Sequence, residues 1–372
     1  MLSPRLELIG IARSGYRHEV AVGRDMKPML ARLVRELPVG DYVYEPKWDG
    51  FRCLAARGDA TVELTSRHGR PLARYFPEIV SALSSVTPDS WLLDGELLAL
   101  ASGRFDFAAL MQRLHPARSR VERLAATTPA LFVVFDLVEE DGRDLSGVPF
   151  AERRERLVRM LGGADAPLFV TPASDDARVA AAWLERFRGG GVDGVVAKRR
   201  DLRYEPGARA MLKVKHECTA ECVVAGVRVA GEPLQVWSLL LGLYDGAGTL
   251  HNVGVASSFS KRLRLELARE LRPLFVPITE HPWEHGFLVE GGPMGRLAGA
   301  AGRWTPAMEL DWVPLRPERV VEVSYTQVDG HRLRHPAKFA RWRPDREPSS
   351  CRLEQLDVEP ADVSGLLHDV DR

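Results

Sequence analysis

The sequence has few cysteines and no long apolar segment. Its four cysteines, Cys53, Cys218, Cys222 and Cys351, include no Cys-x-x-Cys pair. The two closest also lack a companion His/Cys pair, so a structural zinc site is not expected and reduced thiols are the default. No run of about 18 apolar residues occurs, so we expect no membrane-spanning helix.

Net charge is also absent, because 51 Lys and Arg residues balance 51 Asp and Glu residues. Proteins that bind nucleic acids are often basic as a whole, so composition gives no support for such a partner, and any basic surface must be local. The length of 372 residues suggests two domains. The apolar and charged fractions are those of an ordinary globular protein.

The first 25 residues contain neither the apolar core of a secretory signal nor a clear amphipathic periodicity. The stretch that follows, Met26-Lys27-Pro28-Met29, resembles a natural start. We therefore expect residues 1–25 to be a disordered leader or the product of a misassigned start codon. We expect the protein to be a cytoplasmic monomer.

Mixed short strands and helices predict an α+β domain over residues 26–218. Apolar and β-branched segments predict strands at 43–44, 51–55, 61–65, 91–93, 131–135, 192–197 and 211–215. Proline and glycine boundaries and apolar periodicity predict helices at 149–161 and 175–187. The tripeptide Asp94-Gly95-Glu96 is typical of a turn after the strand at 91–93.

The texture changes after His216. Strands are predicted at 222–229, 236–244, 250–256 and 320–328, with one helix at 261–271. About five strands with an inserted helix favour a small β-barrel of the OB type over residues 219–346. The remaining tail, residues 347–372, is acidic and short of aromatics, so we expect it to be poorly packed.

The octapeptide Glu45-Pro46-Lys47-Trp48-Asp49-Gly50-Phe51-Arg52 places a lysine two residues before an Asp-Gly turn signal. A lysine acts as a nucleophile only after losing its proton, which burial and neighbouring cations favour. Taken alone, the pattern more often marks a turn beside a solvated lysine. Its meaning therefore depends on the rest of the chain.

Two further segments suit phosphate binding. Lys213 and Lys215 alternate with apolar residues, so both point to one face of a strand, where they suit a polyphosphate or form a solvated face. Arg67 in Thr65-Ser66-Arg67 suits a phosphate clamp, although a lone arginine is more often a surface residue.

Three more residues have two interpretations each. Glu96 suits ribose hydroxyls or Mg²⁺, unless it belongs to an ordinary turn. Phe135 ends an apolar strand and either stacks on a purine or fills the core. Asp193 in Asp193-Gly194 offers a second carboxylate at the start of a strand.

The order of these segments resembles the motif series of the covalent nucleotidyltransferases, namely ATP-dependent DNA ligases, RNA ligases and mRNA capping enzymes. The segment from Phe339 to Arg346 resembles the last ligase motif, of the Arg-x-Arg-x-Asp-Lys/Arg type. The likeness is greatest to the stand-alone bacterial ATP-dependent ligases of the ligase C type, on the strength of residues 44–52 and of Arg334-His335-Pro336. This resemblance implies a nucleotidyltransferase (adenylation) domain followed by an OB-type barrel.

The resemblance also implies roles at the nucleotide. Lys47 would attack the α-phosphorus of ATP and carry AMP as a phosphoramidate. Glu45 would lie beside the adenine amino group, and Phe135 would stack on the ring. Arg52 and Glu96 would bind the ribose.

Further roles concern charge. Arg67 would contact the AMP phosphate and later the 5′-phosphate of DNA, while Lys213 and Lys215 would reach the α-phosphate. Asp193 and Glu96 would hold Mg²⁺, which Mn²⁺ can replace. The family more often carries Glu-Gly where this chain has Asp193-Gly194, so the carboxylate contacts the metal directly or through water.

The barrel would supply the remaining groups. The last motif would orient the leaving pyrophosphate through Arg341, Arg343 and Asp345. The basic stretch before it would contact DNA phosphates through Arg332, Arg334 and Lys338, which predicts salt-sensitive binding to a nick.

The resemblance implies a DNA ligase that seals 3′-OH/5′-phosphate nicks in double-stranded DNA through lysyl-AMP and DNA-adenylate intermediates, in DNA repair. Three alternatives stay open: an RNA ligase, a capping-type guanylyltransferase that uses GTP, and a non-catalytic DNA-binding protein in which Lys47 is dispensable.

Overall fold

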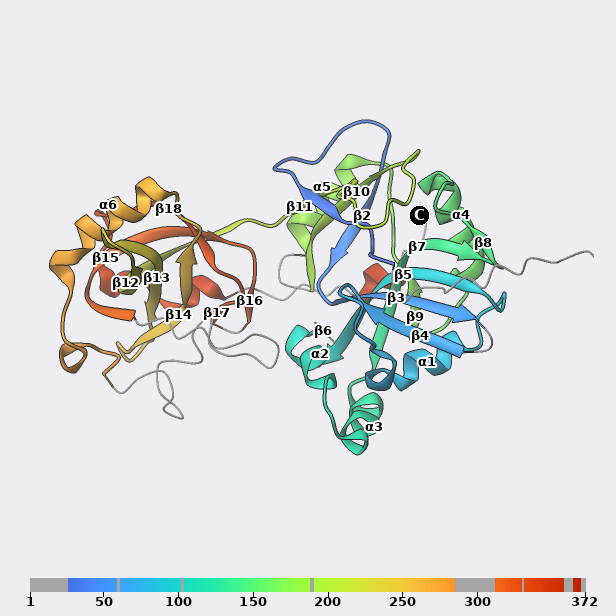
Figure 1. The fold of residues 1–372 in the computed structure, drawn as a ribbon, viewed down its shortest axis with the longest axis horizontal. Coiled ribbons are helices and arrows are strands. Elements are labelled where there is room, and N and C mark those ends of the chain that lie inside the picture. The colour runs from blue at the N-terminus through green and yellow to red at the C-terminus, as the bar shows by residue number, and fades with distance from the viewer. Residues whose placement is uncertain are drawn as a thin grey trace, which may run out of the picture.

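The computed structural model describes residues 26–58, 61–101, 104–187, 191–284, 312–329, 331–357 and 364–368. The expectation for residues 1–25 therefore lies outside the described part of the chain. Two bodies lie side by side (Figure 1). We call the part from residue 26 to 217 the sheet domain and the part from 218 to 357 the barrel.

Two sheets form the sheet domain. The smaller sheet has the order β1-β11-β10-β2, with strands β1 (Ala31–Leu33), β11 (Met211–Lys215), β10 (Val192–Arg199) and β2 (Tyr42–Trp48). The larger sheet has the order β4-β3-β5-β7-β8, with strands β4 (Thr61–Ser66), β3 (Phe51–Gly58), β5 (Trp91–Ala101), β7 (Ala130–Glu140) and β8 (Arg143–Asp144). Two short strands extend it, β6 (Arg104–Phe105) on β5 and β9 (Leu168–Val170) on β7.

Five helices accompany these sheets: α1 (Pro77–Leu83), α2 (Phe107–Arg113), α3 (Arg118–Thr127), α4 (Phe150–Leu161) and α5 (Ala177–Arg186). Helices α1 and α4 bury their apolar faces in the same core as the larger sheet, where Leu83 and Leu157 join Phe132. Asp176 accepts a backbone hydrogen bond from Arg178 at the start of α5, as an N-cap residue does.

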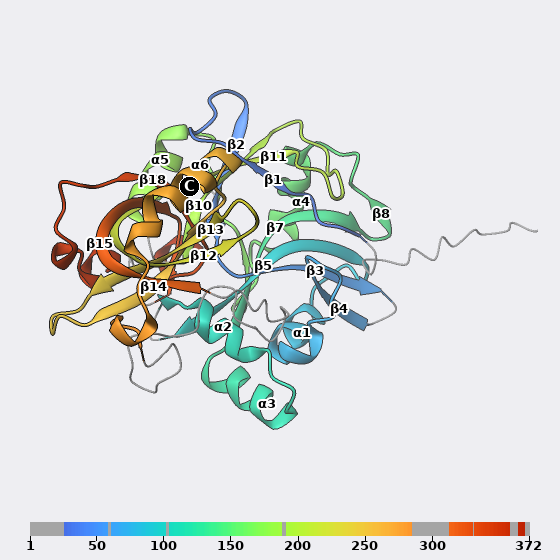
Figure 2. The same ribbon diagram turned by 60° about the vertical axis from the view of Figure 1, so that its left-hand side comes forward.

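The barrel is closed in the order β12-β13-β14-β18-β15. Its strands are β12 (Cys218–Ala230), β13 (Gln235–Tyr244), β14 (Leu250–Ser257), β15 (Trp312–Tyr325) and β18 (Ala337–Trp342), and a hairpin of β16 (Val328–Asp329) and β17 (Arg332–Leu333) precedes the last of them. Helix α6 (Lys261–Leu271) packs on the barrel beside β13 and β18 (Figure 2). Closure leaves no free sheet edge among these five strands.

The expected α+β domain followed by a barrel is confirmed. The helix predicted at 261–271 matches α6 residue for residue. The boundaries at 26–218 and 219–346 stay predictions. None of the described helices is long and apolar enough to cross a membrane.

The turn expected at Asp94-Gly95-Glu96 is wrong, because β5 continues through it to Ala101. Gly95 serves packing between strands: a Cβ there would lie 2.6 Å from the ring of Phe132. A register shift between Asp94 and Gly95 accommodates this approach. The glycine therefore marks contact between neighbouring strands rather than a change of direction.

The poor packing expected for the tail is also wrong for its described residues. Cys351, Leu353 and Leu356 are buried in the core of the barrel. Leu366 and Leu367 are buried in an apolar cluster of the sheet domain. The prediction was based on the average composition of the tail, which is acidic. Average composition does not reveal that a few apolar side chains are buried.

Candidate active site

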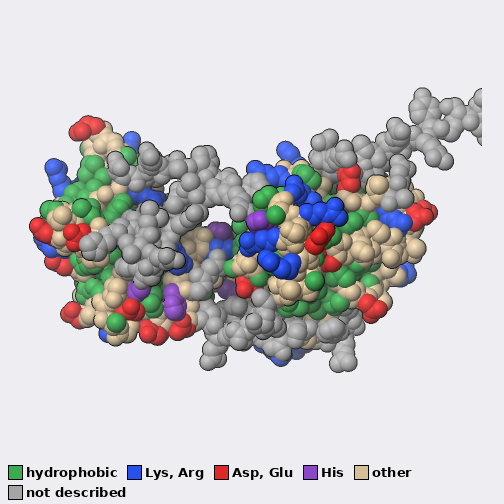
Figure 3. Space-filling view, turned by 90° about the horizontal axis from the view of Figure 1, so that it is seen from below, with side chains coloured by type: hydrophobic (Ala, Val, Ile, Leu, Met, Phe, Trp, Pro, Cys, Tyr) green, Lys and Arg blue, Asp and Glu red, His purple; other side chains and the backbone are tan. Residues whose placement is uncertain are grey.

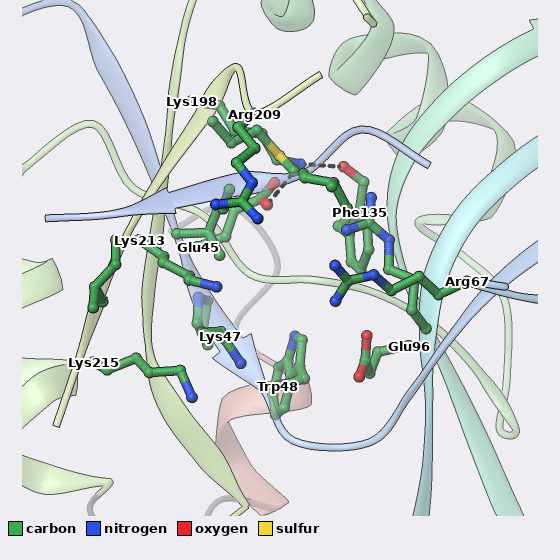
Figure 4. Close-up of a pocket in the computed structure, with 17 residues that line it drawn as sticks. Glu45, Lys47, Trp48, Arg67, Glu96, Phe135, Lys198, Arg209, Lys213 and Lys215 are labelled. Carbon is green, nitrogen blue, oxygen red and sulfur yellow. Dashed lines mark hydrogen bonds and ion pairs between the residues drawn. The ribbon is translucent and has the colours of Figure 1, made fainter. Parts of the chain in front are cut away.

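A pocket of about 390 Å³ opens between the two sheets of the sheet domain. Residues from β2, β10 and β11 line one wall, and residues from β3, β5 and β7 line the other. Figure 4 shows their side chains converging on a shared space. Seven of the lining residues are cationic: Lys47, Arg52, Arg67, Lys198, Arg209, Lys213 and Lys215. Such a concentration suits a polyanion.

Strand register explains how the lysines meet. In the smaller sheet, Gly194 of β10 pairs with Lys47 of β2 on one side and with Lys215 of β11 on the other. The next row joins Glu45 and Lys213 through Val196 in the same way. Because side chains alternate along a strand, these four charged residues share one face of the sheet.

Asp193 interrupts this alternation. The register of β10 shifts between Val192 and Gly194, so the carboxylate reaches the lysine face. Its Oδ2 lies 2.7 Å from Nζ of Lys47 and 2.7 Å from Nζ of Lys215. Burial alone would raise the pKa of Asp193, but the two ammonium groups hold that pKa below its usual value. A charged carboxylate thus links the candidate nucleophile to Lys215, a candidate phosphate-binding lysine.

Lys213 and Arg67 complete the cationic end of the pocket. Burial lowers the pKa of Lys213, and the positive charges of Lys47, Lys215 and Arg67 lower it further. An anion bound among these groups would relieve their mutual repulsion. The structure therefore brings together the four candidates expected at the α-phosphate.

The opposite end of the pocket holds Glu45 and Phe135. Glu45 is 3% exposed, and its Oε2 is 2.8 Å from Nζ of Lys198, which also donates a hydrogen bond of 2.8 Å to the carbonyl of Phe135. Oε1 of Glu45 accepts no hydrogen bond from the described residues, although Nη1 of Arg154 forms an ion pair with it at 3.5 Å. Burial raises the pKa of Glu45 although Lys198 opposes this effect. A buried carboxylate oxygen that accepts no hydrogen bond, beside an aromatic ring, suits a ligand N–H.

Arg52 and Glu96 lie between the two ends. Arg52 donates two hydrogen bonds to Asp94, of 2.7 and 2.6 Å, and its guanidinium stands 4.8 Å from the ring centre of Phe135. Oε1 of Glu96 accepts a hydrogen bond from the amide of Gly50. Burial raises the pKa of Glu96 to about 7, against the lowering effect of Lys47 and Arg52. Glu96 is thus poised to change charge near neutral pH.

The barrel contacts this site through Arg334. Its guanidinium forms an ion pair with Asp49, two residues after Lys47, and lies over the ring of Phe107. The contact joins the two domains at the edge of the pocket. Arg334 is therefore engaged with the sheet domain instead of being left free for DNA.

The last motif is not at the pocket. Arg341 pairs with Glu322, while Arg343 pairs with Glu221 and Asp345, all on the barrel. Of the other expected DNA contacts, Lys338 is 66% exposed and Arg332 is half-buried. The roles assigned to these residues stay predictions.

Among the charged and aromatic residues that line the pocket, three were absent from the sequence-based candidates: Trp48, Lys198 and Arg209. Lys198 did carry a signal, because a lysine inside the apolar strand Val195-Val196-Ala197-Lys198 needs a buried partner. Arg209 lies in the loop before β11 and carried none. Figure 3 shows Lys and Arg side chains gathered on the sheet domain at the side that faces the barrel.

A cation would find one suitable donor here. Oδ1 of Asp193 is buried and has no hydrogen-bond partner among the described residues. The described chain has no group of three or more His, Cys, Asp and Glu residues that could hold a metal. Mg²⁺ commonly binds through one or two carboxylates plus substrate phosphates, so Asp193 beside a polyphosphate fits it.

Comparison with known proteins agrees with this geometry. Residues 26–215 match the family model described as ATP dependent DNA ligase domain, and residues 234–346 match the ATP dependent DNA ligase C terminal region. A solved Lig E DNA ligase covers 85% of this chain and 99% of its own, with 19% identity and a TM-score of 0.52, which supports the fold alone.

Two relatives are similar over most of their lengths. The chain is 47% identical over 337 residues to DNA ligase C2 of Mycolicibacterium smegmatis, covering 90% of this chain and 95% of that protein. It is 46% identical over 345 residues to DNA ligase C of Mycobacterium tuberculosis, with coverages of 91% and 95%. The chain therefore belongs to the ATP-dependent DNA ligases, beside the bacterial ligase C proteins.

Proposed function

We propose that this ligase seals 3′-OH/5′-phosphate nicks in double-stranded DNA during repair, with Lys47 as the nucleophile. The observation that carries the proposal is the pairing of Lys47 and Lys215 on one oxygen of Asp193, inside a cationic pocket that also has the buried carboxylate of Glu45, one oxygen of which accepts no hydrogen bond. Phosphoryl transfer depends mainly on alignment and on neutralising charge, and this pocket offers both.

The first step binds ATP across the pocket. Phe135 stacks on adenine, and Oε1 of Glu45 accepts its amino hydrogen. Arg52 and Glu96 face the ribose, while Arg67, Lys213 and Lys215 surround the α-phosphate. Nζ of Lys47, as the free amine, attacks the α-phosphorus, so an N–P bond forms as the P–O bond to pyrophosphate breaks and one proton leaves Lys47.

Asp193 has a second part in this step. It fixes Lys47 and Lys215 when the pocket holds no nucleotide. Its free Oδ1, together with Glu96, would hold Mg²⁺ or Mn²⁺ against the phosphates. When bound, this cation supplies positive charge that neutralises the triphosphate oxygens.

The later steps move AMP to DNA. An oxygen of the 5′-phosphate at the nick attacks the phosphorus of the lysine-bound AMP, so a P–O–P linkage forms as the N–P bond breaks, which releases Lys47 and gives a DNA-adenylate. The 3′-hydroxyl then displaces AMP and closes the phosphodiester. Arg67 contacts the phosphate in both steps, and Arg332 and Lys338 bind the flanking backbone, so we expect nick binding to weaken with salt.

The last motif would act during adenylation, before the steps that involve DNA. Arg341, Arg343 and Asp345 would orient pyrophosphate in a different placement of the barrel, because here they pair with the barrel itself. We further propose that the protein works as a monomer in the bacterial cytoplasm.

The test is covalent labelling. Purified protein with Mg²⁺ is incubated with α-labelled ATP, and in parallel with labelled GTP and NAD. We expect label only from ATP and none with Lys47→Ala. Lys338→Ala, on the exposed surface of the barrel, serves as the matched lysine control and keeps the label. Label from GTP instead would favour a capping-type enzyme.

A second assay separates the nucleic-acid substrates. The labelled protein is given nicked DNA or nicked RNA duplexes. Sealing of DNA supports the proposal, whereas preferential sealing of RNA would contradict it. A Lys47→Ala protein that retains all function would favour a non-catalytic DNA-binding role.

A further inference from the structure

The C-terminal segment, Ser364–His368, lies on the sheet domain. Leu366 and Leu367 are 5% and 4% exposed and belong to the same apolar cluster as Trp48 and Phe105. In Figure 4 a ribbon in the colour of the C-terminus passes behind Trp48, the residue that follows Lys47. Two leucines from the end of the chain thus cover the back of the strand that carries the nucleophile.

The preceding residues are fixed to the other domain. Cys351 and Leu356 are buried in the core of the barrel. Gln355 and Glu221 exchange two hydrogen bonds, of 3.0 and 3.1 Å, each side chain amide atom of Gln355 meeting the backbone of Glu221. Asp357 lies 3.0 Å from the ring of His331. The tail is therefore anchored on the barrel up to residue 357.

The chain consequently joins the two domains twice. The first connection is the pair His216 and Glu217 between β11 and β12. The second runs from Asp357 to Ser364, with the six intervening residues outside the described part of the chain. Seven extended peptide units reach at most about 25 Å. While the leucines stay bound, this length limits how far the barrel can move.

We propose that Ser364–His368 is a clasp that binds the apolar face behind β2 and holds the barrel where Arg334 meets Asp49. The occupant of that face is this chain's own C-terminus. Two apolar side chains suit such a reversible contact, since they bury modest surface without a buried polar group that would need a partner. The tether raises their effective concentration at the face, so a small contact suffices.

The clasp has a consequence for DNA. A barrel that is already held beside the pocket loses less freedom when a nick binds, so binding is tighter. Adenylation of Lys47 does not use the segment, because neither leucine lines the pocket. Removing the clasp should therefore weaken nick binding and leave adenylation nearly unchanged. The DNA consequence rests on the proposed sealing function; the tethering does not.

The first experiment compares two single charges in the full-length protein. Leu366→Asp places a carboxylate in the apolar cluster. Gly365→Asp is the matched control, because Gly365 is exposed and a Cβ there meets nothing within 4 Å. For Leu366→Asp we expect a larger radius of gyration in small-angle scattering and nick affinity lowered about fivefold to tenfold. Wild-type scattering in Leu366→Asp would overturn the clasp.

A second variant separates a tether from simple core packing. Twelve Gly/Ser residues inserted after Asp357 leave both leucines intact but lengthen the connection. A tether predicts a larger radius of gyration and weaker nick binding, whereas core packing alone predicts no change in either. The same insertion after Gly246, in the exposed β13–β14 turn, is the control. An unchanged long-linker protein would overturn the proposal even if Leu366→Asp fails to fold.

Covalent labelling with ATP distinguishes the two proposals. If the long-linker protein keeps both the label and the wild-type radius of gyration, the clasp is contradicted and the proposed ligase chemistry is not. Absence of label from the wild-type protein would contradict the proposed adenylation. The scattering measurements would still test the clasp. Equal losses of label and of nick binding in Leu366→Asp would assign the leucines to the core and overturn the clasp.

Discussion

Asp193 uses one oxygen for two ammonium groups and leaves the other without a partner among the described residues. An isolated carboxylate at this depth would tend to take up a proton. Lys47 and Lys215 prevent this by lowering its pKa. The residue thus keeps its charge, which both positions the nucleophile and offers an oxygen to a cation.

We predict that Asp193→Asn slows adenylation of Lys47 by roughly 100-fold, because the amide neither pairs with the lysines nor attracts a cation. Single-turnover labelling with α-labelled ATP measures the rate. Asp193→Glu is the control, since it keeps the charge and adds one methylene; it should stay within about tenfold of wild type. Near-normal labelling in the Asn variant would show that Asp193 is only structural.

Glu96 provides a pH test. Burial raises its pKa to about 7, so the carboxylate is protonated below this pH and ionised above it. In the ionised form both oxygens of the carboxylate can accept hydrogen bonds, including one from the ribose, whereas protonation turns one of them into a donor. We expect the KM for ATP in adenylation to rise as pH falls from about 8 to about 6, by up to roughly tenfold.

Glu96→Gln is the control for this pH effect. Its amide does not titrate, so its KM for ATP should lack this rise at low pH. The ratio of the variant's KM to the wild-type KM should therefore fall as the pH is lowered. The phosphates of ATP titrate equally in both assays and cancel in the ratio. A ratio that is constant with pH would exclude Glu96 as the titrating group.

At the scale of elements, glycines in the strands show what the sequence could and could not predict. Asp49-Gly50 was read as a turn, and β2 does end at Trp48. The same dipeptide pattern at Asp94-Gly95 and Asp193-Gly194 falls inside β5 and β10. There the glycines admit a neighbouring strand or ring, a requirement that depends on tertiary contacts and leaves no local signature.

Gly194 gives the sharpest case. Its φ is +148°, and a Cβ would lie 2.0 Å from the carbonyl oxygen of Val214 on β11. We predict that Gly194→Ala separates β10 from β11, lowers the thermal midpoint of the sheet domain by roughly 5–10 °C and reduces adenylation. Gly58→Ala, where a Cβ meets nothing within 4 Å, should leave both unchanged. Equal midpoints for the two variants would contradict this explanation.

The resemblance to the ligase motif series carried most of the site prediction. Alternation with apolar residues predicted the shared face of Lys213 and Lys215. The pairing with β10 then places Lys215 in the row of Lys47 and Lys213 in the row of Glu45. Lys198 and Arg209 were missed, since one is buried by distant partners and the other lies in a loop. Loop positions and buried ion pairs depend on the packed fold, which a single sequence does not reveal.

At the scale of the whole molecule, the barrel contacts the sheet domain at the edge of the pocket through Arg334, while the arginines of its last motif stay paired within the barrel. Arg334 reaches Asp49, whereas Arg341 and Arg343 pair with acidic residues of the barrel. Chain length and the change in strand pattern after His216 predicted two domains but not this orientation, in which Arg334 contacts Asp49, a residue far away in the sequence.

We predict that Arg334→Ala leaves adenylation of Lys47 within about twofold of wild type but slows sealing of nicked DNA by the adenylated protein roughly tenfold or more, because Arg334 does not line the pocket yet holds the barrel at Asp49. The two rates are measured separately, by labelling and by single-turnover ligation. Arg316→Ala is the matched control, since Arg316 pairs with Glu318 on the barrel, and should affect neither rate. If Arg334→Ala instead slowed both rates equally, the contact would support the pocket itself rather than the placement of the barrel.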